Sequence, residues 1–143
     1  MKISILLPYK ENYSPEYPGA VSLFVSQTIK HSRYKNSIKV FGNSNFKSIL
    51  SSNYTDINLN KASPFQSQTK NYVNKFVELQ KKIKTDIIEV HNRPSYLKYF
   101  DKLDSKIVLY FHNDPLEMDG SKKTDERLNL LMNCEKIIFN SLW

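Results

Sequence analysis

Short apolar runs alternate along this chain with amphipathic stretches of helical period. The apolar runs predict strands at residues 2–8, 37–42, 86–90, 106–111 and 135–139, with a further short strand at 56–59. The amphipathic stretches predict helices that begin near Pro18 and at residues 66–84, 94–100 and 124–133. Strands that alternate with helices are typical of an α/β domain. We therefore expect a doubly wound, mostly parallel sheet with helices on both faces, which is a Rossmann-like arrangement.

The apolar positions of each predicted helix indicate the face that it turns toward the core. These inward positions are Val21, Phe24, Val25, Thr28 and Ile29 in the first helix, Tyr72, Val73, Phe76, Leu79, Gln80 and Ile83 in the second, and Leu128, Leu131 and Met132 in the last. Pro94 is suited to the first position of a short helix, because its fixed φ is already helical.

Composition and charge limit the classes of protein to consider. The 143 residues suit one domain, and 40% hydrophobic with 13% aromatic residues is typical of a globular chain. A single cysteine, Cys134, predicts a reducing, cytoplasmic compartment. The net charge of +7 admits nucleic acid, anionic lipid or a phosphorylated ligand as a partner. Because the lysines are scattered without interleaved aromatics, we expect no nucleic-acid binding and at most a weak contact with the inner membrane surface.

Several common sites are excluded by their missing motifs. Three glycines cannot build a dinucleotide fingerprint or a P-loop, and the chain has no Asp-x-Asp pair. The histidines His91 and His112 follow different predicted strands, and one cysteine cannot make a structural zinc site. We therefore expect no metal and no cofactor.

Two predicted strands end in His-Asn. His91, Asn92 and Arg93 follow the strand at 86–90, and His112, Asn113 and Asp114 follow the strand at 106–111. Ligands of open parallel sheets bind at the carboxyl ends of the strands, so both segments are expected to face one cleft. There an imidazole can bind a hydroxyl, Asn and Asp can bind vicinal hydroxyls, and Arg93 can bind phosphate or carboxylate. Taken singly, each segment also fits a turn or a helix cap.

The start of the first predicted helix is a second candidate binding site. Gly19 and Ala20 are small and follow the long polar loop after the first strand. Small residues there allow an anion to approach backbone N–H groups at the positive end of the helix dipole. The alternative is that Gly19 only relieves a tight turn.

Together these segments resemble the N-terminal half of a family-4-type glycosyltransferase of the two-domain GT-B fold, as found in bacterial envelope polysaccharide and lipopolysaccharide synthesis. The matching segments are the first strand ending at Pro8, the helix start at residues 18–21, the strand ends at 87–92 and 108–114, and the strand at 137–141.

The resemblance implies a retaining, metal-independent transfer of a sugar from a nucleotide-sugar donor to a hydroxyl of a glycan or lipid-linked acceptor. It implies that His112 contacts the transferred sugar or the acceptor and that the start of the first helix lies beside the donor phosphate. Residues 1–143 would be the acceptor-side domain of a longer hexosyltransferase, inactive without its C-terminal domain. Family members often have two adjacent glycines where this chain has Gly19 and Ala20. The alternative is a stand-alone flavodoxin-like binding or interaction module without catalysis.

Overall fold

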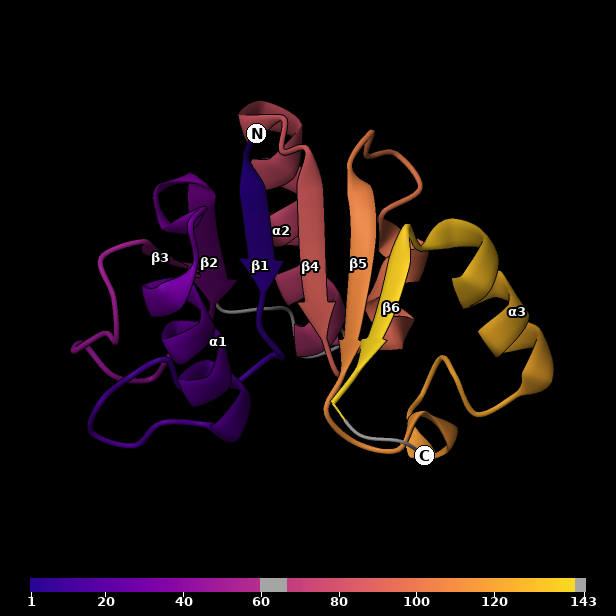
Figure 1. Ribbon diagram of the computed structural model, residues 1–143, viewed down its shortest axis with the longest axis horizontal. Helices are drawn as coiled ribbons and strands as arrows, with labels where there is room; N and C mark the ends of the chain where they lie inside the picture. The colour runs from indigo at the N-terminus through magenta and orange to yellow at the C-terminus, as the bar shows by residue number, and fades with distance from the viewer. Residues whose placement is uncertain (60–66, 141–143) are drawn as a thin grey trace.

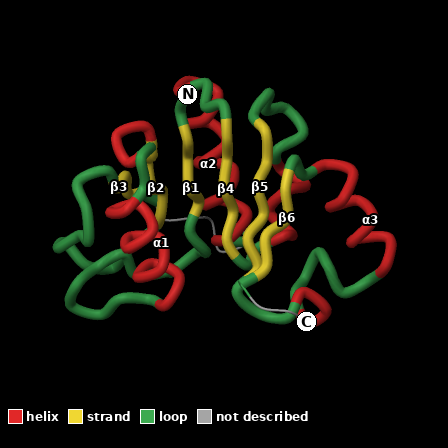
Figure 2. The backbone as a smooth tube through the Cα atoms, viewed as in Figure 1, coloured by secondary structure: helices red, strands yellow, loops and turns green. Residues whose placement is uncertain are grey.

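The protein folds around one six-stranded sheet in which every strand is parallel to its neighbours (Figures 1 and 2). The structure is a computed structural model that describes residues 1–59 and 67–140. The strand order is β3-β2-β1-β4-β5-β6. The strands are β1 (Ile3–Leu6), β2 (Ile38–Gly42), β3 (Tyr54–Asp56), β4 (Ile87–His91), β5 (Lys106–Phe111) and β6 (Lys136–Phe139). This order confirms the doubly wound, Rossmann-like α/β fold, and the order of strands reverses between β1 and β4.

Helices cover both faces of the sheet, as expected. They are α1 (Ala20–His31), α2 (Gln68–Ile83) and α3 (Thr124–Asn133), with the short 3₁₀ helices η1 (Lys35–Ser37), η2 (Pro94–Tyr99) and η3 (Pro115–Glu117). Figure 1 shows α1 and α2 on opposite sides of the sheet, with α3 beyond β6. Gln66, the expected first residue of the second helix, and Ser141, the last residue of the expected final strand, lie outside the described residues.

The core is divided by the sheet into two apolar layers, because successive side chains of a strand point to opposite faces. Val21, Val25 and Ile29 of α1 are buried against Ile5 and Val40. The larger layer lies on the other face, where α2 and η2 pack over the sheet. It includes Leu6, Phe41, Tyr72, Val73, Phe76, Val90, Tyr96, Leu109 and Phe111.

Two details differ from the sequence prediction. Thr28 is exposed, so the buried face of α1 lacks one of the positions that are predicted to face the core. The third strand covers Tyr54–Asp56 rather than 56–59, since its pairing with β2 begins at Tyr54 opposite Val40. Residue Ile57 is buried just after it.

The inward face predicted for α3 is wrong. Leu130 is buried at 6% exposure, whereas the predicted Leu128, Leu131 and Met132 are 56%, 67% and 85% exposed. Four apolar residues within five positions cover most of the circumference of a helix. Their pattern therefore does not select a face, and the contact of α3 with the edge of the sheet does.

Candidate functional site

Two histidines meet at the carboxyl edge of the sheet. His91 is the last residue of β4, and His112 directly follows β5. In the parallel register His91 lies opposite Tyr110. Alternation along each strand then places Glu89, His91, Tyr110 and His112 on one face, the face that α1 covers. The structure thus confirms the prediction that both strand ends lie at one edge of the sheet.

Phe24 of α1 covers the two imidazoles. Its ring centre lies 6.2 Å from that of His91 and 4.8 Å from that of His112, in edge-on contacts, and 5.1 Å from that of Tyr110. Tyr110 in turn lies nearly parallel to His112, with ring centres 4.6 Å apart. The histidines thus lie in a half-buried aromatic environment that limits the approach of water.

A chain of hydrogen bonds joins the histidines to a carboxylate. Oε1 of Glu89 lies 2.7 Å from Nε2 of His91, and Nδ1 of His91 lies 2.8 Å from Nε2 of His112. His91 is fully buried, while Glu89 and His112 are partly exposed. Among the described residues, Nδ1 of His112 has no hydrogen-bond partner. That nitrogen is the end of the hydrogen-bond chain.

The environment keeps His112 uncharged at neutral pH. Burial, followed by the neighbouring His91, lowers its pKa from 6.5 to about 4, and Glu89 only partly opposes this shift. A neutral imidazole has one N–H donor and one bare nitrogen acceptor. His112 can therefore accept a hydrogen bond from a ligand at physiological pH without first losing a proton.

Asn92 holds the two strand ends together. Its backbone has φ of 52°, in the left-handed region that Asn tolerates well, and its N–H donates to the Tyr110 carbonyl at 2.9 Å. Its side chain accepts from the His112 N–H at 2.7 Å and donates to Oδ1 of Asn113 at 3.0 Å. Both asparagines are predicted to bind substrate, and what the structure shows is that Asn92 fixes the backbone of His112 and that Asn113 accepts from the Asn92 amide.

Arg93 and Asp114 lie apart from the histidine pair. The Arg93 guanidinium donates to the Asn92 carbonyl at 2.8 Å and lines a cavity of about 360 Å³ with Thr69, Tyr96 and Lys122. This cavity is lined from α2 and η2, on the other face of the sheet. The Asp114 carboxylate accepts from the Leu116 N–H at 2.8 Å, which caps η3. This bond fits the alternative given by the sequence, in which the segment forms a turn or a helix cap.

The start of α1 is occupied by a carboxylate of the protein itself. Oε1 of Glu11 accepts from the Ser22 N–H at 3.1 Å. A Cβ added at Gly19 would lie only 1.9 Å from the same oxygen. Gly19 therefore makes room for a carboxylate, and Ala20 is the exposed first residue of the helix. An external phosphate at this position would have to displace Glu11.

Glu11, Phe24, Glu89 and Tyr110 were not among the predicted site residues. One signal was present in the sequence, because Glu89 stands two positions before His91 on a predicted strand and so shares its face. The same spacing relates Tyr110 to His112. Nothing in the loop sequence indicates where Glu11 lies.

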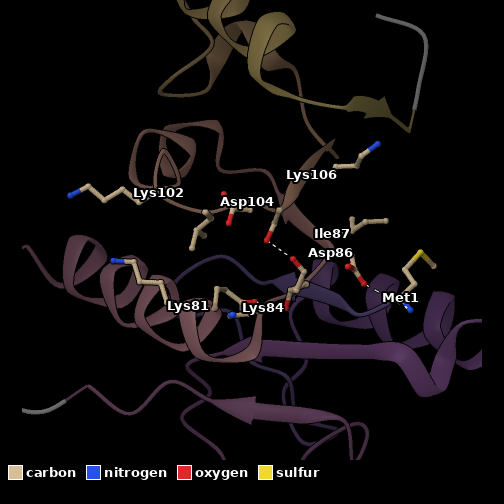
Figure 3. Close-up of a pocket in the computed structure, with 12 residues that line it drawn as sticks. Met1, Lys81, Lys84, Asp86, Ile87, Lys102, Asp104 and Lys106 are labelled. Atoms are coloured by element: carbon tan, nitrogen blue, oxygen red, sulfur yellow. Dashed lines mark hydrogen bonds and ion pairs between the residues drawn. The ribbon is translucent and has the colours of Figure 1, made fainter.

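A cavity at the opposite, amino edge of the sheet has a charged rim (Figure 3). Its volume is about 690 Å³, and Lys81, Lys84, Lys102 and Lys106 line it together with Asp86. Figure 3 shows the Lys102 and Lys106 side chains extending to opposite sides. Lys106 is also paired with Glu135 at 3.0 Å. Since the cations diverge and ligands of such sheets bind at the carboxyl edge, we assign the site to the histidines.

Within residues 1–59 and 67–140, no group of three His, Cys, Asp or Glu side chains is placed to hold a metal ion. No helix in this part of the chain is long and apolar enough to cross a membrane. The chain matches no protein-family model, and a search of curated proteins found no similar sequence.

Proposed function

We propose that this domain forms the acceptor-side half of a glycosyltransferase that uses a nucleotide-sugar donor, with His112 contacting a hydroxyl of the transferred sugar or of the acceptor. The observation that carries the proposal is the meeting of both His-Asn strand ends at one sheet edge, beside α1. The resemblance of these strand ends to those of family-4-type enzymes supports it. A hexosyl donor and an acceptor in envelope polysaccharide or lipopolysaccharide synthesis follow from that resemblance.

The spacing between the two candidate subsites suits a sugar phosphate. Ala20 and Phe24 are four positions apart and share one face of α1, and Phe24 touches His112. The start of the helix is thus about one turn, roughly 5.4 Å along its axis, from the residue that covers the imidazole. A phosphate at the helix start and a sugar hydroxyl at His112 would then belong to one ligand. In this scheme Glu11 leaves the helix start when the donor binds.

Catalysis in this proposal is mainly positional and electrostatic. The half-buried edge orients a hydroxyl through His112, and the helix dipole of α1 stabilises negative charge on the departing diphosphate. No metal enters the scheme. The remaining donor contacts would come from a C-terminal domain.

The test is a donor screen on the polypeptide expressed from its complete coding sequence. Consumption of a nucleotide sugar is measured for the wild type, for His112→Ala and for His31→Ala. His31 is the exposed last residue of α1 and provides a matched control. We expect His112→Ala to lower turnover roughly tenfold or more and His31→Ala to leave it unchanged.

Unchanged turnover in His112→Ala would remove His112 from the site. A complete protein that consumes no nucleotide sugar would instead support the second candidate, an interaction module without catalysis. The observation that favours this candidate is the exposed apolar side of α3, where Leu128, Leu131 and Phe139 border a mostly apolar cavity of about 310 Å³. Sedimentation of wild type and Leu131→Ser then shows whether this side mediates association.

A further inference from the structure

The hydrogen bonds that join Glu89, His91 and His112 form a chain with a direction. The direction is set by the atoms that are able to donate. A carboxylate only accepts hydrogen bonds, so the 2.7 Å contact requires His91 to carry its proton on Nε2. With a single proton on its ring, His91 then has a bare Nδ1. The 2.8 Å contact between this atom and Nε2 of His112 therefore requires His112 to donate from Nε2. The remaining nitrogen of His112, Nδ1, is left as an acceptor.

We propose that Glu89 is a positioning residue that acts through His91 to present Nδ1 of His112 as a hydrogen-bond acceptor, so that the site selects a ligand group able to donate, and we assign that group as a hydroxyl. An ether, a carbonyl or a fully ionised phosphate oxygen has no proton to offer and would meet this lone pair unfavourably. The identity of the hydroxyl as that of a sugar rests on the proposed function. The direction of the hydrogen-bond chain does not rest on the proposed function.

The surroundings of the pair preserve this direction. The ring planes of His91 and His112 are within 21° of each other, which suits an edge-to-edge hydrogen bond. Complete burial of His91 keeps water from competing for its nitrogens. The backbone N–H of His112 donates to Oδ1 of Asn92, and Phe24 covers the two rings without adding charge. Glu89 is therefore the charged group that sets which nitrogens carry protons.

The first experiment reads the tautomers directly. Long-range proton–nitrogen NMR spectra are recorded at neutral pH on isotope-labelled protein for the wild type, Glu89→Leu and the control Glu78→Leu. Glu78 is an exposed residue of α2. In the wild type we expect His112 to be protonated on Nε2 and bare on Nδ1. In Glu89→Leu we expect a rise in the form of His112 that is protonated on Nδ1, and in Glu78→Leu no change.

Three results would overturn the proposal. They are a proton on Nδ1 of His112 in the wild type, protons on both nitrogens of His91, or a folded Glu89→Leu protein whose His112 tautomer is unchanged. The wild-type spectrum alone decides the first two, so the test stands even where Glu89→Leu does not fold.

The second experiment tests the class of ligand. Methyl glycosides of glucose, galactose and mannose are titrated into the wild type and Glu89→Leu, and the Nδ1 resonance of His112 is followed. We expect at least one glycoside to shift this resonance in the wild type and to shift it less in Glu89→Leu. The absence of any shift refutes the hydroxyl assignment. Because neither experiment requires sugar transfer, a protein with the expected tautomers but no turnover would contradict only the proposed function.

Discussion

The contact between Gly19 and Glu11 leads to a prediction about stability that can be worked out from the structure. In Gly19→Ala the new Cβ would lie 1.9 Å from Oε1 of Glu11, far inside any allowed contact. The backbone of Gly19, with φ of −75° and ψ of 155°, is an extended conformation that alanine adopts without strain. The clash is therefore relieved by movement of the Glu11 side chain, which loses its hydrogen bond to the Ser22 N–H.

Two opposing effects set the magnitude. Losing a carboxylate that caps the first turn of a helix costs about 1 kcal/mol, in the range of about 0.5–2. Replacing glycine by alanine at an unstrained position returns about 0.4–1 kcal/mol, because the unfolded chain loses conformational freedom, but Gly19 is the N-cap of α1, where glycine is preferred to alanine by a similar amount. Gly19→Ala alone should then destabilise the fold by about 0.5–2 kcal/mol. When Glu11 is already alanine, Gly19→Ala should be close to neutral.

The assay is urea unfolding of the wild type, both single variants and the double variant, which form a double-mutant cycle. The expected coupling between Glu11 and Gly19 is about 1 kcal/mol. A parallel cycle with Glu16→Ala serves as the control, since the Glu16 carboxylate instead accepts from the Ser48 hydroxyl at 2.7 Å. Equal effects of Gly19→Ala with and without Glu11 would refute the assignment of Glu11 to the start of α1.

Three further predictions concern the core and the histidine pair. Leu130→Ala should cost about 2–5 kcal/mol in urea unfolding, whereas Leu131→Ala should stay within about 0.5, because only Leu130 is buried. Tyr72→Phe should cost about 1–3 kcal/mol by the same assay, since the buried hydroxyl donates to the Leu7 carbonyl at 2.9 Å. Stability should fall as the pH drops from 6.5 toward 4, because the lowered pKa of His112 lets the unfolded chain take up the proton first. The loss is on the order of 1 kcal/mol for this part-exposed group, and His112→Asn should flatten that part of a pH series of unfolding curves.

The order of elements could be predicted from the sequence because every strand except β3 is a short, mainly apolar run bounded by polar residues or proline. Such local signals were correct for β4, whose apolar run is interrupted only by Glu89, and for β5, whose run from Ile107 to Phe111 is uninterrupted. They gave the bounds of α3 but not its buried face, because its consecutive apolar residues mark no single face, and they failed for the bounds of β3, whose pairing with β2 is a non-local choice. In both cases the outcome depends on tertiary contacts that periodicity does not encode.

The residue types of the candidate site could be predicted from the sequence, but the hydrogen bonds between them could not. Two His-Asn strand ends in a parallel sheet had to share an edge, and they do. That Arg93 would lie over the other face could not be read from its position beside His91 and Asn92. The left-handed turn at Asn92 and the start of η2 at Pro94 redirect the chain between these neighbours. The hydrogen bonds that define the pair join residues about twenty positions apart.

The net charge of the chain does not describe the chemistry of its carboxyl edge. The chain carries +7 overall, yet the two groups that organise this edge are the carboxylates of Glu11 and Glu89. Each accepts from a fixed donor, one at a helix start and the other on a buried imidazole. Exposed lysines are spread over the surface and are screened by salt, whereas partly buried carboxylates act at short range. In the proposed site, the groups offered to a ligand are therefore set by these two carboxylates, through the N–H of Ser22 and the proton between Glu89 and His91, and the scattered lysines have little influence on them.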